Sequence, residues 1–431
     1  MTLDVNIARA GDHAVLIEFD RDIVAPELHA KAHAARSARG VLACIVGHSS
    51  LYVVFTDSFD ANVLNHPSTR QAVNPSTHRI KVSLRDDYAQ DLREFLTHTK
   101  QTKAEFTNRL ATLKLTVRYL GFRGGFAYLD GWPAEWAMPR RTTSRPVARG
   151  SFAIAGSVAG FYPIDTPGGW NVLGRTSENV ENRFAAGDVI AIEPTTDIVA
   201  EQARAPVLHN FPGIVAPFIT RVARANWQNL ERGLPVGGPF DLEAADAARL
   251  AASASHDVFE FAQIGPKVTP DSNVFLGWCD VNGVRVQRVR RDETYDFGRI
   301  RNGLRGYLAI GERPGHTAEL HRDDRLTIRA IRGPHDIGVN ELECEVTPKL
   351  DRIGIRMRPS QELTAPADLP SIGMQFGSLQ LHPDGSIVAM GPDHPVTGGY
   401  LQPMTVMWSE RWKLAHLTPG ERVRFVAVDQ L

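Results

Sequence analysis

One glycine-rich stretch in the first half of the chain restricts the fold more strongly than any other sequence feature. GSFAIAGSVAGFYPIDTPGGWNVLGRT, from Gly150 to Thr176, contains six glycines separated by short runs of small or apolar residues. Glycine weakens helices and permits tight turns and close approach of the backbone, so this stretch predicts short strands joined by turns. Two explanations of the glycines remain open. They form the turns of a small β-barrel, or they form the wall of a binding site at which the backbone contacts a ligand.

The same pattern of short strands and Gly/Pro turns covers most of the chain. Helical patterns are confined to residues 26–40, 86–99, 102–113 and 242–254. In the second of these segments Asp86 or Asp87 is the expected cap, and the third starts with a Thr102–Glu105 capping box. The dominance of short strands indicates a barrel or a sandwich.

We therefore predict a mostly β protein with α+β parts. The final strand RVRFVAV resembles DVIAIEP at residues 188–194, because each follows a turn with glycine and ends a β-rich unit. This similarity indicates that the two halves share one type of barrel. The predicted domains are a small α/β domain at 1–76, a barrel domain at 77–204, and a β-rich region at 205–431 with subdomains at about 215–335 and 336–431.

The composition is that of an average globular protein. The chain has 431 residues, of which 43% are hydrophobic and 23% charged, and its net charge is −1. This charge argues against a nucleic-acid binder. The three cysteines are far apart, which argues against a disulfide framework or a zinc site and fits a reducing compartment. No signal peptide or membrane span is evident, and no metal is expected, so the prediction is a cytoplasmic protein that does not contact membranes.

Two sets of motifs resemble known families. GFRGGFAYLDGWPAEWAMPRR at residues 121–141, followed by the glycine-rich stretch, resembles allophanate hydrolase subunit 1, a family that includes the B subunit of 5-oxoprolinase and Kip-type sporulation kinase inhibitors. The second half resembles the C subunit of 5-oxoprolinase, or allophanate hydrolase subunit 2. The matching segments there are GLPVGGPFD, FEFAQIGP, GYLAI, DRIGIRM, VTGGY and LTPGERVRFV, in that order. The chain therefore resembles a fusion of the two subunits.

This resemblance implies cyclophilin-like barrels and a function. The implied activity is ATP-dependent opening of 5-oxoproline to glutamate, with ATP as cofactor and a small amide or lactam as substrate. The implied partner is a separate LamB/YcsF-type protein, the A subunit of 5-oxoprolinase. One alternative is the carboxyltransferase domain of urea amidolyase, which would act on urea or a similar amide and would require biotin. The other is a repurposed paralogue, acting as a binding or regulatory module or as an enzyme of different chemistry. A homo-oligomer is compatible with each alternative.

Several departures from the family pattern favour that last alternative. A segment after GYLAI is missing, and several expected polar residues are replaced. The replacements are Leu110, Gly124, Val158, Ala159, Ala248 and Pro395.

The candidate binding residues are cations, tyrosines and glycine turns. Arg140 and Arg141 could bind a carboxylate or a phosphate, or form surface ion pairs. Tyr128 and Tyr162 could donate hydroxyl hydrogen bonds to a carbonyl oxygen, with Tyr128 in a catalytic role, or could be half-buried structural residues. Two similar turns could bind an anion through their amides or could be plain hairpins. They comprise Gly168, Gly169 and Trp170, and Gly398, Gly399 and Tyr400.

Two aspartates are the candidate catalytic carboxylates. Asp241 caps a helix in the simplest interpretation, and it would serve as a general base if the preceding GLPVGGPF loop wraps a substrate. Asp393 is adjacent to His394, a pair that suggests acid–base chemistry. Adjacent residues of a strand point to opposite faces, which argues against their acting together.

Overall fold

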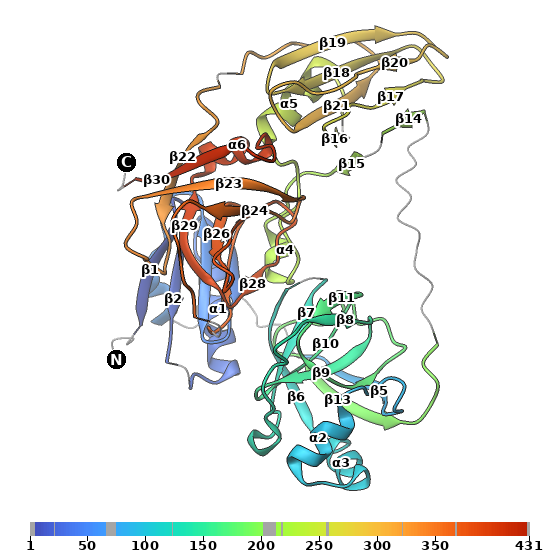
Figure 1. The fold of residues 1–431 in the computed structure, drawn as a ribbon, viewed down its shortest axis with the longest axis vertical. Coiled ribbons are helices and arrows are strands. Elements are labelled where there is room, and N and C mark those ends of the chain that lie inside the picture. The colour runs from blue at the N-terminus through green and yellow to red at the C-terminus, as the bar shows by residue number, and fades with distance from the viewer. Residues whose placement is uncertain are drawn as a thin grey trace.

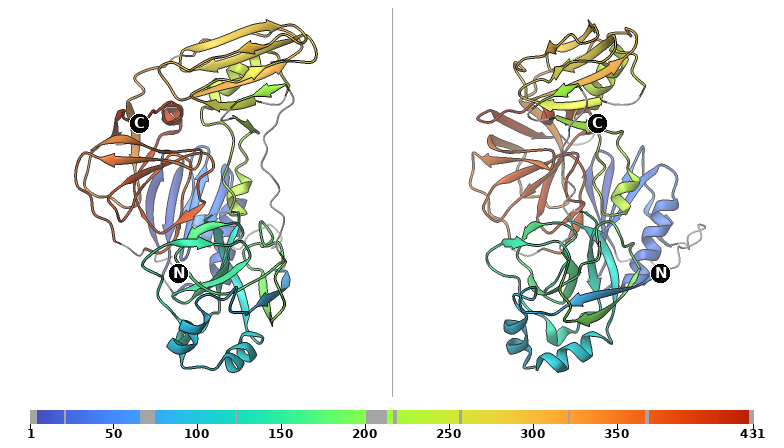
Figure 2. Two further views of the ribbon diagram at one scale, coloured as in Figure 1. Left: turned by 45° about the vertical axis from the view of Figure 1, so that its right-hand side comes forward. Right: turned by 90° about the vertical axis from the view of Figure 1, so that its right-hand side faces the viewer.

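The computed structural model of the chain contains two closed β-barrels, an N-terminal sheet and a middle domain (Figure 1). The middle domain and the first barrel lie at opposite ends of the long axis, and the N-terminal sheet and the second barrel lie between them (Figures 1 and 2). None of the helices described is long and apolar enough to cross a membrane. The structure describes residues 5–20, 22–65, 75–122, 124–200, 213–216, 219–255, 258–320, 322–366 and 369–428.

The N-terminal sheet is antiparallel and is buried on both faces. Its strands occur in the order β1 (Asn6–Gly11), β2 (Ala14–Glu18), β4 (Ser50–Phe55) and β3 (Val41–Val46). Alternate residues of a strand face opposite sides, and both sides here are apolar. Ile17 and Val53 pack with helix α1 (Ala25–Ser37), whereas Leu16 and Tyr52 pack in one cluster with the second barrel.

The first barrel carries two helices on its outside. Phe95 of α2 (Leu92–Thr99) and Phe106 of α3 (Lys103–Leu110) join the barrel core beside Trp136. The predicted capping box between Thr102 and Glu105 is confirmed. The strands are β5 (Thr77–Ser83), β6 (Lys114–Gly121), β7 (Phe126–Asp130), β9 (Ser151–Ala155), β10 (Val158–Phe161), β12 (Asn171–Arg175) and β13 (Val189–Thr195).

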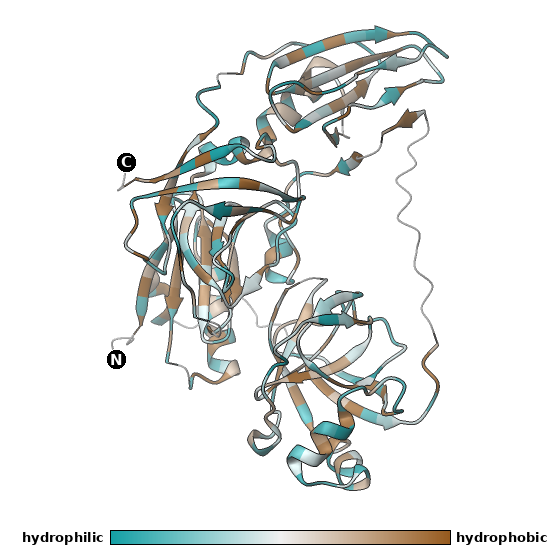
Figure 3. Ribbon diagram, in the orientation of Figure 1, coloured by the Kyte–Doolittle hydropathy of each residue, from teal (hydrophilic) through white to brown (hydrophobic). Residues whose placement is uncertain are grey.

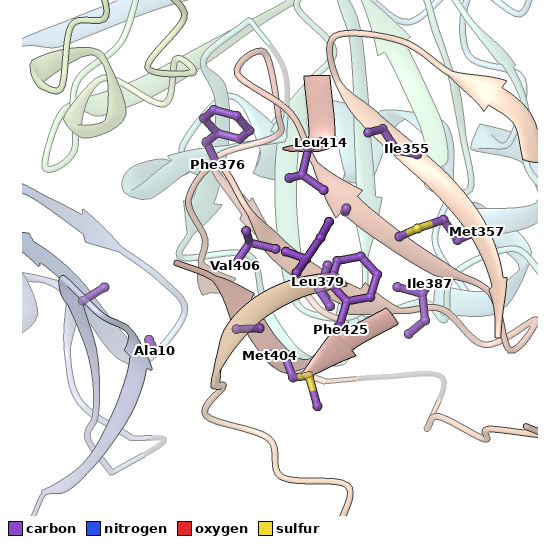
Figure 4. Packing of buried hydrophobic residues seen from close by; sticks show 14 of the residues in the cluster. Ala10, Ile355, Met357, Phe376, Leu379, Ile387, Met404, Val406, Leu414 and Phe425 are labelled. Carbon is purple, nitrogen blue, oxygen red and sulfur yellow. The ribbon is translucent and has the colours of Figure 1, made fainter. Parts of the chain in front are cut away.

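The second barrel has the same topology as the first. In each barrel the last strand pairs in parallel with the first strand, and the other pairings occur in the same order. Its core contains Met357, Leu379, Ile387 and Phe425 (Figure 4). Its strands are β22 (Thr327–Arg332), β23 (Glu341–Leu350), β24 (Gly354–Pro359), β26 (Ser378–Leu381), β27 (Ile387–Met390), β29 (Leu401–Val406) and β30 (Arg422–Ala427). The prediction that the halves share a barrel type is confirmed.

Each barrel also carries the same small two-stranded insertion. In the first barrel β8 (Arg145–Val147) pairs with β11 (Thr166–Gly168), and in the second β25 (Ile372–Gly373) pairs with β28 (Thr397–Gly398). The glycine–aromatic turns noted in the sequence follow β11 and β28. They therefore occupy equivalent places in the two barrels.

The middle domain consists of two antiparallel sheets and a helix. Helix α5 (Leu242–Ala251) packs its alanines against the larger sheet, and Asp241 caps it by accepting a hydrogen bond from the Ala244 amide. The larger sheet has the order β15 (Ile219–Val222), β16 (Val258–Ala262), β21 (Arg305–Gly311), β18 (Val274–Asp280) and β19 (Gly283–Val289). The smaller sheet has the order β14 (Ile214–Val215), β17 (Lys267–Val268) and β20 (Tyr295–Asp296). Two short helices, α4 (Gln228–Glu231) and α6 (Arg411–Ala415), also occur in the chain. Hydrophobic residues concentrate on the strands of the sheets and barrels (Figure 3).

The start of helix α2 and one domain boundary differ from those predicted from the sequence. Helix α2 begins at Leu92, with Asp91 at its N-cap, so Asp86 and Asp87 do not cap it. The expected boundary near residue 335 falls within the second barrel, because β22 pairs with β29 and β30. The expected boundary between residues 204 and 205 lies outside the described residues.

A buried histidine of the second barrel should make the protein sensitive to acid. His394 is 0% exposed and its Nε2 has no hydrogen-bond partner in the described structure. Burial lowers the pKa of His394 from 6.5 to about 4, so the unfolded chain binds a proton there at a pH at which the native state does not. The free energy of unfolding should therefore fall as the pH drops from 6.5 toward 4. The loss by pH 5 is roughly 2 kcal/mol from this residue.

Urea unfolding of the wild type and His394→Gln at pH 7 and pH 5 measures this effect. We expect the variant to lose less stability between the two pH values. Equal losses in both proteins would contradict the assignment.

Candidate functional site

A cleft of about 1040 Å³ lies between the two barrels. The equivalent glycine–aromatic turns both line it, one from each barrel, so Gly168, Gly169 and Trp170 meet Gly398, Gly399 and Tyr400 across the same space. Tyr128, Tyr162, Arg140 and Arg141 line it as well. Ten of the twelve candidate residues named from the sequence therefore come together here.

The wall from the first barrel is aromatic. Tyr128 stacks on Tyr119 at 4.2 Å between ring centroids and contacts Trp170 edge-on at 5.7 Å. Burial raises the pKa of Tyr128 and of Tyr162, so both hydroxyls stay protonated and can donate hydrogen bonds at neutral pH. This wall can hold a flat or cyclic ligand and can donate to a carbonyl oxygen.

The two adjacent arginines have different surroundings. Arg141 donates from Nη1 to Asp91 Oδ1 at 2.9 Å, and Asp91, which is only 3% exposed, also binds Arg145. Arg140 has no ion-pair or hydrogen-bond partner within the described ranges, and its charge acts on both Tyr128 and Tyr162. Arg141 therefore anchors the loop, whereas Arg140 presents an uncompensated guanidinium to the cleft.

The wall from the second barrel also carries polar and charged side chains. His382 stacks on Tyr400 at 4.2 Å with an interplanar angle of 20°. Burial, and then the charge of Arg356, lower the pKa of His382 to about 4, which keeps its ring neutral at pH 7. Lys349 and Arg356 also line this wall. These three residues were not identified from the sequence. His382 and Lys349 lie outside the matching segments, and Arg356 lies within DRIGIRM, where nothing distinguishes it as a ligand.

The structure answers the question raised by the glycine-rich stretch. A Cβ on Gly168 would lie 2.2 Å from Tyr162 Oη, and a Cβ on Gly160 would lie 2.7 Å from the Phe126 ring. The backbone of Trp170 hydrogen-bonds to Tyr162. These glycines therefore make room for aromatic side chains, and through them they shape the cleft wall.

A matched pair of alanine variants tests this role. Gly168→Ala should displace Tyr162 and cost about 1–3 kcal/mol of stability, the usual penalty for overpacking. Gly169→Ala should be close to neutral, because its nearest atom would be the Arg141 carbonyl oxygen at 3.4 Å. Thermal unfolding measures both, and equal effects would contradict the steric explanation.

The structure does not bring Asp241 into the cleft. Asp241 is 0% exposed, accepts from Arg322 Nη2 at 2.8 Å and accepts from His416 Nε2 at 3.0 Å. Burial alone would raise its pKa, but His416 and Arg322 outweigh burial and lower it. The prediction of a base here is corrected: a buried, fully paired carboxylate next to the N-terminus of α5 is a structural group.

Asp393 is also outside the cleft. Its carboxylate accepts from Arg352 Nε at 2.7 Å, while His394 is bound through Nδ1 to the Pro395 carbonyl. Asp393 and His394 therefore have separate partners and do not form an acid–base pair. The one carboxylate among the described lining residues is Asp351, whose Oδ1 already accepts the amides of Ile353 and Gly354.

Metal ligands are not clustered in the described part of the chain: no group of three or more His, Cys, Asp or Glu residues there could hold a metal ion. The cysteines Cys44, Cys279 and Cys344 are buried, and burial raises the pKa of each to about 12. The polar side chains among the described lining residues include arginines, a lysine, tyrosines and histidines.

Comparison with family models identifies the protein's relatives. Residues 5–185 match the carboxyltransferase domain, subdomain C and D, and residues 312–427 match the carboxyltransferase domain, subdomain A and B. Together the matches span more than half of the chain. The chain belongs to the carboxyltransferase domain family. Both halves of that domain are present on one polypeptide, with C and D first, and the cleft lies between a barrel from each half.

Individual proteins support the same assignment for this carboxyltransferase-domain protein. It is 29% identical over 224 residues to the 5-oxoprolinase B subunit of Bacillus subtilis, covering 44% of this chain and 92% of that protein. It is 34% identical over 79 residues to the 5-oxoprolinase C subunit of Haemophilus influenzae, covering 18% of this chain and 26% of that protein. The resemblance to a fusion of the B and C subunits is thereby confirmed.

A solved structure shows the same fold along almost the whole length. The crystal structure of TTHA0988 aligns with a TM-score of 0.81 at 20% sequence identity, covering 96% of this chain and 99% of that one. The mostly β fold with small barrels, predicted from the sequence, is confirmed.

Proposed function

We propose that this chain is the fused B and C component of a 5-oxoprolinase-type lactam hydrolase, and that the cleft binds the lactam. The observation that supports this most strongly is Arg140, an unpaired cation among the described residues beside two protonated tyrosines and an aromatic wall. The substrate 5-oxoproline has a carboxylate, a ring and an amide carbonyl. The cleft offers a complementary group for each of these.

Each part of the lactam has a partner in this proposal. The Arg140 guanidinium binds the carboxylate with charge-assisted hydrogen bonds. The ring packs against Trp170 and Phe126, which contact each other at 5.2 Å. The hydroxyl of Tyr128 or Tyr162 donates to the amide oxygen, where negative charge increases as the bond is broken.

The remaining chemistry requires ATP and a second chain. ATP would supply its terminal phosphoryl group to the amide oxygen, with ADP as the leaving group. Attack of water on the carbonyl carbon would then break the ring C–N bond and release inorganic phosphate, so that the products would be glutamate, ADP and phosphate. Asp351 is the one carboxylate among the described lining residues, and its Oδ1 accepts two backbone amides, so we expect the general base to come from a LamB/YcsF-type partner protein. Partnership is consistent with the relatives, which are named as subunits.

Glutamate formation from 5-oxoproline tests this function. The purified chain, its LamB/YcsF-type partner, ATP and 5-oxoproline are combined, and glutamate is quantified with each component omitted in turn. We expect glutamate only when all four are present. Absence of glutamate from a verified complex of the two proteins would overturn the proposal.

Carboxyl transfer is the second candidate, because both family models carry that name. It would require biotin on a separate carrier and a substrate such as urea. Carboxybiotin distinguishes the candidates. Transfer of the carboxyl group from carboxybiotin to an amide such as urea, with release of biotin and with no glutamate formed from 5-oxoproline, would favour carboxyl transfer.

A further inference from the structure

The cleft has a second cationic end, on the second barrel. Lys349 of β23 and Arg356 of β24 belong to one hairpin, in which Thr347 Oγ1 donates to the Arg356 carbonyl at 2.7 Å. Both residues also line an adjoining hollow of about 790 Å³. Arg140 and Arg141 stand on the first barrel, so the cleft has positive charge at both sides.

The donors at this second end are only partly used. Arg356 Nη1 donates to Asp384 Oδ2 at 2.8 Å and to Ser386 Oγ at 2.7 Å, which fixes the guanidinium while leaving its other N–H groups without partners in the described residues. The Lys349 ammonium has no hydrogen-bond or ion-pair partner among them either. His382 adds a buried Nε2 that likewise lacks a partner in the described structure.

The barrel fold does not require these polar groups. Strand β24 is the counterpart of β7 in the first barrel, and where β24 presents Arg356 to the cleft, β7 presents Tyr128. Arg356 is paired with Val388 of the neighbouring strand β27. Tyr128 is paired with Gly160 of the neighbouring strand β10. The two walls thus differ in chemistry although they share a backbone plan.

We propose that Lys349, Arg356 and His382 form a phosphate subsite at the second-barrel end of the cleft. The guanidinium, the ammonium and the imidazole are three separate N–H donor groups, which suit the several oxygens of a tetrahedral oxyanion better than the two oxygens of a planar carboxylate. This inference rests on the proposed function, in which a phosphoryl group must lie within reach of the lactam oxygen. The phosphate is then the terminal group of ATP or that of a phosphorylated substrate.

Calorimetric titration of the full-length chain with inorganic phosphate tests the subsite directly. We expect Lys349→Gln and Arg356→Gln each to weaken phosphate binding tenfold or more. Lys81→Gln is the matched control, because Lys81 is an exposed strand residue outside the cleft. Thermal unfolding confirms that each variant is folded. Phosphate binding that is absent from the wild type, or equal in all four proteins, would overturn the proposal.

Two further titrations identify the source of the phosphate and separate this inference from the proposed function. If ATP binding falls in parallel with phosphate binding, the subsite holds the terminal phosphate of the nucleotide. If only phosphate binding falls, it holds the phosphate of a substrate. Binding of 5-oxoproline should be unchanged in Lys349→Gln. Phosphate binding that depends on Lys349 without any glutamate formation would support the subsite and reject the hydrolase.

Discussion

Arg140→Ala is expected to lower kcat/KM for 5-oxoproline about 10- to 100-fold, which corresponds to the loss of a charge-assisted hydrogen bond of about 1.5–3 kcal/mol. The reason is that Arg140 is exposed to the cleft and has no carboxylate partner among the described residues, so its guanidinium is available to the substrate carboxylate. Steady-state glutamate formation in the presence of the partner protein measures the change. Thermal stability should stay close to that of the wild type.

Two other arginines serve as controls for that experiment. Arg79→Ala removes an exposed arginine outside the cleft and should leave both kcat/KM and stability unchanged. Arg141→Ala should lower stability, because it removes one of the two cations that pair with the buried Asp91. If Arg140→Ala and Arg79→Ala have the same kcat/KM, Arg140 does not bind the substrate.

Asp241→Ala is expected to destabilise the protein by about 3–5 kcal/mol, the usual cost of removing one partner from a buried ion pair. It would leave Arg322 and His416 without their shared carboxylate and would remove the cap of α5. Urea unfolding measures the change. Asp246→Ala is the control on the same helix, since its ion pair with Arg249 is partly solvent-exposed and worth less than about 1 kcal/mol.

The same experiment separates a structural from a catalytic role for Asp241. A variant that unfolds far more easily, yet retains kcat under conditions in which it is folded, has lost a structural group. A variant of normal stability that has lost kcat would show that Asp241 acts in catalysis, contrary to the geometry.

The sequence predicts the barrels well because their signals are local. Short apolar runs and glycine turns specify each strand, and the matching terminal strands at 188–194 and 422–428 already indicate two barrels of one type. The capping box at Thr102 is equally local. Helix α2 was predicted to start too early because Asp86 and Asp87 look like caps, whereas Asp91 at the true N-cap is bound by distant arginines.

The sequence predicts those residues of the candidate site that belong to a recognisable motif. Arg140, Trp170 and Tyr400 belong to recognisable segments, and the fold brings them to one cleft. Lys349, Arg356 and His382 reach the cleft through the pairing of β23, β24, β26 and β27. Arg356 belongs to the matching segment DRIGIRM, but nothing in that segment marks it as a ligand, and the other two lie outside the matching segments. Asp241 is a residue that the sequence suggests as catalytic and the structure does not support. A carboxylate after a glycine-rich loop looks catalytic in the sequence, whereas its buried partners become visible only in the structure.

A crystal structure of the chain with 5-oxoproline bound would show whether the cleft is the lactam site. We expect the lactam in the cleft between the barrels, with its carboxylate on Arg140, its ring against Trp170 and its amide oxygen within hydrogen-bonding distance of the Tyr128 or Tyr162 hydroxyl. The lactam bound elsewhere, or bound in the cleft with its carboxylate away from Arg140, would contradict it.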